Sequence, residues 1–462
     1  MSETKTQVIR IGPRRQIEIQ RARDAVQALG LFSVLIPIWL FLADGNLANP
    51  AQADILQIGN RLSALIGTSL LLVHLALVAR IPWIESTLGL DKLTLAHKKL
   101  GKPLLYVLLI HSALAVVSYS NISQVSLLVG FFQLSFGYLD VLLALGAMVL
   151  MVLVVVSSIR IARKRMSYES WYLVHLLSYV AILAAIPHQF SFGTDFLTQP
   201  LMASYFTLLY FFVFANLVWF RILQPIVLSI LAGLKVTRVV PDRNRTTSLV
   251  IGGRKLSRFG AEAGQFFLVR VLTKSQWWRP HPFSVSNSPA DEIRFTIGNR
   301  GDDTALMQNL KVGTRVILEG PFGVFTEQKR TRRHVTLLAA GIGIAPIRAL
   351  AESLAAEPGD VTIIYRTNDE RDAALLDEVR RISDERGHRL KVVTGERGAT
   401  GGFLPADPSQ TPEHALLLAM APNLLDSDIY VCGPAPWSKL VKAALNKLRI
   451  PKTQIHIEEF AW

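Results

Sequence analysis

The segment His97–His111, HKKLGKPLLYVLLIH, begins and ends with histidine and is strongly apolar after Pro103. Histidine is costly in hydrocarbon and usually marks a functional site when it occurs there. The two histidines are 14 residues apart (111 − 97), and 14 steps of about 100° end only about 40° short of four helical turns. They therefore share one helix face, about 21 Å apart along the axis. The spacing predicts a membrane helix with a histidine near each end.

A second pair, His175 and His188, lies 13 residues apart (188 − 175) in a later apolar stretch. In an ideal helix this pair would be about 140° out of phase, and Pro187 offers a kink that corrects the mismatch. If both stretches run outward from the cytoplasm, His97 and His175 share one depth, and His111 and His188 share another. Two imidazoles facing each other at one depth are what a six-coordinate haem requires. The four histidines thus predict two stacked b-type haems; the simpler alternative is packed or interfacial polar residues.

The apolar residues of the chain are concentrated in its first half. Of the 462 residues, 50% are hydrophobic, and the mean hydropathy is +0.34. Six stretches are long enough, or nearly so, to cross a hydrocarbon core of about 30 Å: residues 25–43, 62–79, 103–119, 138–159, 171–187 and 201–223. The third is short and is expected to extend upstream of Pro103. Residues 25–224 are therefore predicted to form a six-span transmembrane bundle.

Positive charge indicates the orientation of these spans. Lys and Arg are concentrated in the basic tail, residues 1–24, and in the loops after spans two and four, whereas the opposite loops contain only Arg61. This asymmetry predicts cytoplasmic N- and C-termini in a plasma or inner membrane. The net charge of +14 then suits a membrane lipid surface, and no nucleic-acid partner is expected. The polar, basic N-terminus predicts no cleavable signal peptide.

Three single residues have narrower interpretations. The lone Cys432 excludes a disulfide framework and a cysteine-ligated iron–sulfur cluster. His74, in LLVHLAL, is expected to face the bundle or a haem propionate rather than to bind iron. Arg61 would pair with a propionate or stabilise a developing superoxide; a snorkelling interfacial arginine is the alternative.

The second half of the chain has the pattern of a soluble protein with two domains. Residues 234–327 contain short alternating strands separated by Gly and Pro, which predict an antiparallel β-barrel. Residues 328–462 alternate strands with helices, which predicts an α/β domain with a doubly wound parallel sheet. Between its first strand and helix lies GIGIAP, Gly341–Pro346, where backbone amides can approach a dinucleotide pyrophosphate.

The motif HPFS, His281–Ser284, follows within the predicted barrel, and RGDDT, Arg300–Thr304, comes after it. With these motifs, the barrel and parallel sheet resemble the ferredoxin–NADP reductase superfamily. Together with the four membrane histidines, the whole chain beyond the tail resembles the ferric reductase and NADPH oxidase family of transmembrane flavocytochromes. Gly320-Pro321-Phe322-Gly323 fits the same family, or is only a tight turn into the second domain.

The resemblance implies an FAD site. Ser284 would hydrogen-bond flavin N5, Phe283 would pack on the cofactor, and His281 would lie towards the ribityl or pyrophosphate. The RGDDT segment would open a helix that receives the pyrophosphate. The expected FAD-binding residues are His281, Pro282, Phe283, Ser284, Arg300, Gly301 and Thr304.

The resemblance also implies an NAD(P) site. Arg366 would contact the 2′-phosphate, with Arg371 as the alternative, which favours NADPH over NADH. Cys432 would shape the geometry of hydride transfer, and Phe460 would stack on the flavin, with Trp462 as the competitor for that role. The expected coenzyme-binding residues are Gly341, Gly343, Pro346, Arg366, Cys432, Gly433 and Pro434, and Ser284, Cys432 and Phe460 are expected to be catalytic.

The implied activity is electron transfer across the membrane. Cytoplasmic NADPH would supply hydride to FAD, and single electrons would pass through the haem between His97 and His175 and then the haem between His111 and His188. The acceptor would lie outside the cytoplasm, and ferric iron or a metal chelate is favoured. A superoxide-producing NADPH oxidase, an electron donor to a quinone or membrane partner, a non-catalytic haem sensor and a flavin reductase tethered by inert spans are the alternatives.

Overall fold

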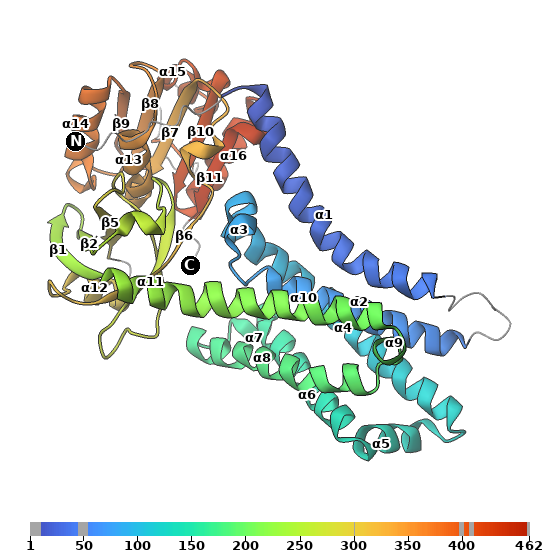
Figure 1. The fold of residues 1–462 in the computed structure, drawn as a ribbon. Helices are drawn as coiled ribbons and strands as arrows, with labels where there is room; N and C mark the ends of the chain where they lie inside the picture. Colours follow the sequence, from blue (N-terminus) through green and yellow to red (C-terminus); the bar gives the residue numbers. More distant parts are fainter. Residues whose placement is uncertain (1–10, 45–53, 300, 397–401, 406–410, 460–462) are drawn as a thin grey trace. The chain divides into compact units, whose positions relative to one another are not determined.

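The computed structural model describes residues 11–44, 54–299, 301–396, 402–405 and 411–459. The chain divides into two compact units (Figure 1). The helical unit comprises Asp24–Pro82 and Leu90–Phe220, and the αβ unit comprises Met1–Arg23, Trp83–Gly89 and Arg221–Trp462.

Six helices among the described residues are long and apolar enough to cross a membrane, as predicted. They are α1 (Pro13–Ala43), α2 (Ile55–Ala76), α4 (Leu90–Ile122), α6 (Leu139–Ser158), α8 (Tyr168–Ser191) and α10 (Pro200–Val218). Polar caps define several starts: the Asp54 carboxylate accepts from the amide of Leu56 at the start of α2, and Ser167 caps α8.

Helix α4 extends upstream of Pro103 as expected, whereas the N-terminal tail and a predicted outer loop contain helices that were not predicted. The α1 helix begins at Pro13, so half of the predicted 1–24 tail is helical. The α4 helix starts at Leu90 and continues through Pro103. A short apolar helix, α5 (Leu127–Gly137), occupies the predicted outer loop and is capped by Ser126. Periodicity alone missed α5 because eleven residues are too few to span a bilayer.

The core of the helical unit lies between helices, and its outer face is apolar. Helix α2 packs on α4, and α6 packs on α8. Phe41, Leu72 and Phe206 lie fully buried in the central cluster. By contrast, Leu173 and Phe211 are about two thirds exposed or more, at 66% and 73%, as expected for side chains that lipid rather than protein covers.

The first part of the αβ unit consists of two antiparallel three-stranded sheets. One has the order β1 (Lys235–Asp242), β2 (Thr246–Gly252), β5 (Glu292–Gly298), and the other β4 (His281–Ser284), β3 (Phe266–Val271), β6 (Val316–Phe322). Single bridges, Lys235 to Arg315 and Val285 to Phe295, join the two sheets at both edges. The predicted antiparallel strands are thus present, as two sheets linked by single bridges around a common core that includes Phe267 and Phe295.

The second part has the predicted doubly wound sheet. Its strands are all parallel, in the order β11 (Ile455–Glu459), β10 (Ser427–Gly433), β7 (His334–Ala340), β8 (Val361–Arg366), β9 (Arg389–Val393). The helices α13 (Ile344–Ser353) and α14 (Leu376–Arg386) bury one face, and α15 (Glu413–Met420) and α16 (Ala435–Lys447) bury the other.

The remaining helices are short. They are α3 (Pro82–Leu88), α7 (Arg160–Arg163), α9 (Thr194–Thr198), α11 (Gln224–Ala232), α12 (Asp302–Gln308), the π-helical turn η1 (Trp219–Leu223) and the 3₁₀ turns η2 (Leu256–Phe259), η3 (Glu327–Lys329), η4 (Gly341–Gly343), η5 (Glu370–Asp372), η6 (Leu424–Asp426) and η7 (Lys452–Gln454).

Two N-terminal segments contact the connection between β6 and β7 within the αβ unit. At the start of α1, the Arg15 guanidinium donates to the Gln328 carbonyl at 3.1 Å. From α3, the buried Glu85 carboxylate accepts from the Gly323 amide at 2.8 Å. The connection between the two sheet domains is therefore held by residues that lie more than 200 positions earlier in the chain.

Candidate functional site

The four predicted histidines lie together in two pairs. The ring centroids of His97 on α4 and His175 on α8 are 6.1 Å apart. Those of His111 on α4 and His188 on α8 are 6.5 Å apart. The α8 helix continues through Pro187 to Ser191, and His188 nonetheless faces His111.

These separations fit a metal ion between each pair. A metal–imidazole bond is about 2.0 Å long, and the ring centroid lies about 1.1 Å behind the ligating nitrogen, so two axial imidazoles hold their centroids about 6 Å apart. No group of three or more His, Cys, Asp or Glu side chains suited to a metal ion occurs among the described residues. Two imidazoles per site suit a metal whose other ligands come from a porphyrin, so the residues present fit haem.

Backbone carbonyls of α2 orient both histidines of α4. Nδ1 of His97 lies 3.1 Å from the carbonyl oxygen of His74, and Nδ1 of His111 lies 3.2 Å from that of Asn60. A neutral imidazole that donates from Nδ1 keeps the lone pair of Nε2 for a metal. The two carbonyls are 14 residues apart (74 − 60), the same interval that separates His97 from His111. Each carbonyl of α2 therefore lies beside the histidine of α4 that it orients.

A hydroxyl orients His175 of α8. Ser158 Oγ, at the end of α6, lies 3.4 Å from Nδ1 of His175 and accepts from the indole N–H of Trp171 at 3.2 Å. The same hydroxyl donates to the carbonyl of Val154 at 2.8 Å, so it acts as an acceptor for the imidazole N–H. The sequence analysis did not predict the contacts of Ser158, Asn60 or the carbonyl of His74. For the two carbonyls, a signal was available in the 14-residue interval between Asn60 and His74, which equals the interval between His97 and His111.

Two residues left open by the sequence have definite surroundings. The ring of His74 stacks on that of His97, with centroids 3.6 Å apart. Arg61 forms a two-point ion pair with Asp195 of α9, with Nη2 2.5 Å from Oδ1 and Nε 3.0 Å from Oδ2. Its guanidinium also lies 4.8 Å from the ring centre of Phe41. Arg61 thus has protein partners, and its side chain is only 21% exposed.

The predicted FAD residues include two buried polar atoms without partners. Strand β4 consists of His281, Pro282, Phe283 and Ser284. The hydroxyl of Ser284 and Nε2 of His281 have no hydrogen-bond partner among the described residues. Burial lowers the pKa of His281, which keeps its imidazole neutral. Buried polar atoms are normally satisfied, so these two fit a site that receives a ligand such as a flavin.

The RGDDT segment begins α12 as predicted. Gly301 precedes the helix with φ +144°, and no atom lies within 4 Å of the position its Cβ would take. The Thr304 hydroxyl donates to the Gly301 carbonyl at 2.9 Å, and Asp303 pairs with Arg279 at 3.0 Å. Arg300 lies outside the described residues.

The two glycine motifs of the parallel sheet meet at its switch point. The order of the strands reverses between β7 and β10, and ligands of such sheets bind beyond the carboxyl ends of the strands at this point. Gly341 follows β7 with φ +55° and open space around it, whereas a Cβ at Gly343 would lie 2.2 Å from the carbonyl of Cys432. Pro346 is buried in α13 and Pro434 precedes α16. The open glycine beside a tightly packed one forms a cradle that fits a dinucleotide.

The flavin motif and the Cys432 motif converge on one junction. Ser284 pairs with Phe266, whose ring carbon would lie 3.2 Å from a Cβ at Gly323. The Glu458 carboxylate would lie 3.8 Å from the same Cβ, and Glu458 pairs with Cys432 between β11 and β10. The sequence analysis gave Glu458 no role.

Burial determines the chemistry of Cys432. Desolvation, with the negative charge of Glu458, raises the pKa of the Cys432 thiol well above its ordinary value. The thiol therefore stays neutral near pH 7 and cannot act as a thiolate nucleophile. Gly433, next in the chain, would place a Cβ 2.7 Å from the Trp437 ring, so this turn is tightly packed.

The two candidate arginines for a 2′-phosphate differ in exposure. Arg366, at the end of β8, is 4% exposed and donates to the carbonyls of Thr367 and Gly395. The Arg371 side chain is 90% exposed and pairs with Asp369 at 2.6 Å. Hydrogen bonds from Arg371 lower the pKa of Asp369 to about 2. Phe460 and Trp462 lie outside the described residues.

Three protein families match consecutive parts of the chain. The ferric reductase like transmembrane component matches residues 63–186, which include His97, His111 and His175 and end two residues before His188. The FAD-binding domain matches residues 243–326, and the oxidoreductase NAD-binding domain matches residues 337–443.

Curated relatives match the second half of the chain. The ferredoxin reductase component of 3-ketosteroid-9-alpha-monooxygenase from Mycobacterium tuberculosis is 28% identical over 241 residues, 49% of this chain and 64% of that protein. The flavohemoprotein of Deinococcus radiodurans is 27% identical over 237 residues, 49% of this chain and 58% of that protein. The chain thus spans less than two thirds of the length of either relative.

Among solved structures, ferredoxin-NADP+ reductase from Plasmodium falciparum aligns with a TM-score of 0.41 at 18% identity, over 49% of this chain and 95% of that one. Flavohemoglobin from Malassezia yamatoensis aligns with a TM-score of 0.41 at 19% identity, over 62% of this chain and 74% of that one. The three family matches follow one another in the predicted order, and the first covers helices long enough to cross a membrane. The chain therefore belongs to the family of oxidoreductases that join a ferric reductase-like transmembrane component to an FAD-binding and an NAD-binding domain.

Proposed function

We propose that this protein is a transmembrane NADPH-dependent reductase that passes electrons from the cytoplasm through FAD and two b-type haems to an external ferric or other metal chelate. The observation that carries the proposal is the double histidine pair, with ring separations of 6.1 and 6.5 Å and Nδ1 of both α4 histidines held by carbonyls.

Each proposed cofactor has residues of this chain to hold it. His97 with His175 would bind one haem and His111 with His188 the other, while Ser284 and His281 supply buried polar atoms for FAD. When bound, FAD converts a two-electron hydride donor into single electrons, and haem iron carries electrons singly. The protein supplies position and environment.

The coenzyme site is proposed to bind NADPH across the switch point. Gly341 leaves room for the pyrophosphate, and the neutral Cys432 thiol restricts where the nicotinamide lies. Of the two arginines, Arg371 is the accessible one, so we assign the 2′-phosphate contact to Arg371, with Arg366 organising the loop beneath it.

The test uses the purified full-length protein in detergent or nanodiscs with NADPH. Ferric chelate under anaerobic conditions and dioxygen are offered separately as sole acceptors, and superoxide is scored independently. Faster NADPH oxidation with ferric chelate supports the proposal. Stoichiometric superoxide with slow ferric reduction would identify an oxidase, and turnover only with a quinone would identify a donor to a membrane partner. Reduced-minus-oxidised spectra without a b-type signal would leave only a tethered flavin reductase.

A further inference from the structure

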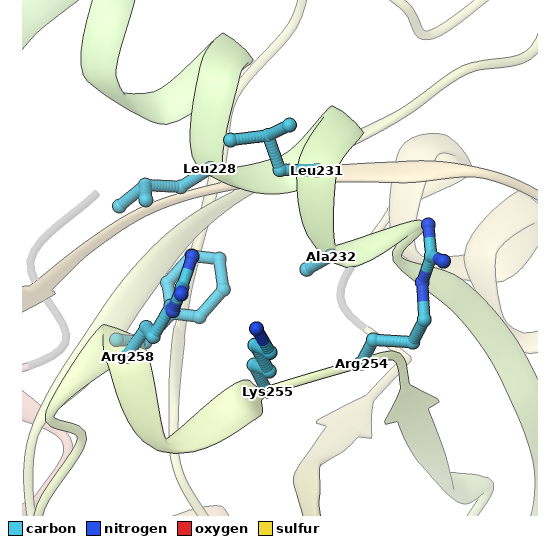
Figure 2. Close-up of a pocket in the computed structure, with 7 residues that line it drawn as sticks. Leu228, Leu231, Ala232, Arg254, Lys255 and Arg258 are labelled. Carbon is cyan, nitrogen blue, oxygen red and sulfur yellow. The ribbon is translucent and has the colours of Figure 1, made fainter.

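A small pocket lies at the end of α11, outside the redox sites (Figure 2). Leu228, Leu231 and Ala232 of α11 form its apolar side. Three cationic side chains from the β2–β3 connection form the opposite side, with the Phe259 ring completing it: Arg254, Lys255 and Arg258. In Figure 2 the Lys255 ammonium points into the space between the two arginines and the helix. The pocket thus combines concentrated positive charge with an apolar wall.

The positive charge of this pocket is not neutralised by carboxylates. Among the described residues, no Asp or Glu forms an ion pair or hydrogen bond with the side chains of Arg254, Lys255 or Arg258. The carboxyl end of α11 contributes only about half a negative charge. Three exposed cations therefore remain available to an anionic ligand.

The backbone holds these cations in place. Lys255 has a left-handed conformation, φ +55° and ψ +44°, which non-glycine residues adopt infrequently and which often marks a functional position. The amide of Arg254 donates to the carbonyl of Ala232 at 2.7 Å, which ties the basic loop directly to the end of α11.

The α11 helix is itself suited to a membrane surface. It ends an apolar helical run, Pro200–Ala232, of 33 residues, which rises about 50 Å and so exceeds a hydrocarbon core of about 30 Å. Ile226, Ile230 and Leu231 are nevertheless 39%, 68% and 59% exposed. Exposed apolar side chains beside unpaired cations are typical of the boundary between lipid tails and headgroups.

We propose that the pocket binds the phosphate of an anionic phospholipid, with Arg254, Lys255 and Arg258 around the headgroup and α11 against the acyl chains. The hollow encloses about 30 Å³, space for about two waters, so a dinucleotide does not fit inside it. A headgroup inserts only its charged part while the rest of the lipid stays in the bilayer. This site is independent of the proposed electron transfer.

The experiment is a titration of delipidated full-length protein with phosphatidylglycerol or phosphatidylcholine, with bound lipid counted by native mass spectrometry. The wild type is expected to bind phosphatidylglycerol preferentially. A triple variant, Arg254→Gln, Lys255→Asn and Arg258→Gln, is expected to bind it at least about tenfold more weakly. Asn is chosen at position 255 because it tolerates the left-handed conformation. Wild-type affinity in this variant would overturn the proposal.

A matched control removes the same charge elsewhere. Lys439, Lys442 and Lys447 are exposed on α16, and their simultaneous replacement by Gln should leave phosphatidylglycerol binding unchanged; an equal loss would show a nonspecific charge effect and contradict the site.

Glycerol 3-phosphate distinguishes a lipid site from a free-anion site, because it should compete poorly. Equal competition by glycerol 3-phosphate, or displacement by single-stranded RNA, would also refute a lipid site. Leu231→Gln keeps all three cations and should weaken phosphatidylglycerol binding severalfold; no change would remove the proposed acyl contact.

Discussion

Nδ1 of His111 lies 3.2 Å from the carbonyl oxygen of Asn60, and Arg61, the next residue, is held by Asp195 at 2.5 Å. The turn of α2 that orients His111 is therefore itself fixed to α9 by an ion pair. This arrangement links the geometry of the pair His111 and His188 to residues that do not touch it.

Replacing His111 by Ala should remove one haem of two. The remaining imidazole of His188 cannot supply both axial ligands, so the haem content should fall by about half while NADPH still reduces the flavin. Haem per protein by the pyridine haemochrome method and stopped-flow flavin reduction measure the two effects. Full haem content, or full-rate delivery to the external acceptor, would contradict the assignment.

Replacing Asp195 by Asn should weaken the outer site without touching a histidine. Loss of one partner leaves Arg61 largely buried without its counter-charge, which we expect to cost about 1–3 kcal/mol, since partial exposure of Arg61 softens the penalty of a fully buried pair. Thermal unfolding and the spectrum of the outer haem are the readouts. The double variant Arg61→Gln, Asp195→Asn should be more stable than Asp195→Asn alone, and a double variant that is additive would show that the pair does not interact.

Replacing Ser284 by Ala should slow reduction of bound flavin by NADPH about tenfold, because a hydrogen bond from a buried hydroxyl is worth about 1–1.5 kcal/mol. Ser284→Thr keeps the hydroxyl and is the matched control. Stopped-flow rates at saturating NADPH provide the comparison. Equal rates in the Ala and Thr variants would exclude a role for the hydroxyl.

Replacing Arg371 by Ala should raise the KM for NADPH about tenfold and leave the KM for NADH unchanged, because only NADPH carries the 2′-phosphate. Arg366→Ala, by contrast, removes donors to the carbonyls of Thr367 and Gly395 and should impair both coenzymes alike. Steady-state kinetics with each coenzyme decide between them. Selective loss of NADPH in Arg366→Ala alone would restore the original sequence assignment.

A pH-dependent contribution to stability is expected from Glu378 of α14. Its carboxylate accepts a hydrogen bond from Arg294 of β5 at 2.9 Å and forms an ion pair with Arg348 of α13 at 2.8 Å. Burial opposes ionisation, but the two arginines outweigh it and lower the pKa of Glu378 below its ordinary 4.5. The depressed pKa means that this stabilisation is present above pH 4.5 and is lost as pH falls through the lower folded value. Denaturation midpoints of wild type and Glu378→Gln should therefore differ near pH 7 and converge in acid; a constant difference would rule out the linkage.

Sequence reasoning located the six long helices and both sheet types because hydrophobic length and strand–helix alternation are local signals. It also paired the histidines whose ring centroids lie 6.1 and 6.5 Å apart in the structure, because residue spacing and charge asymmetry together predict depth. It did not find the carbonyls of Asn60 and His74, the Ser158 hydroxyl or Asp195. Every residue type carries a backbone carbonyl, so the sequence does not show which carbonyl accepts a hydrogen bond. The contact between Arg61 and Asp195 joins residues 134 positions apart, which local patterns do not predict.

Local signals also did not predict the start of α1 or the burial of Arg366. The polar residues 13–24 form the first part of α1. In its first turn, the Arg15 guanidinium donates a hydrogen bond to the Gln328 carbonyl, a tertiary contact that composition does not reveal. Arg366 is the last residue of β8, where the family resemblance implies a phosphate contact, but it is buried and donates to the distant Gly395 carbonyl.

The equal 14-residue intervals on α2 and α4 restrict how this protein can change length. Insertion or deletion of one residue between Asn60 and His74 would turn one carbonyl by about 100° relative to the other, leaving one imidazole of α4 without its acceptor. We therefore expect natural homologues to tolerate substitutions in this stretch of α2 far more readily than any change in its number of residues.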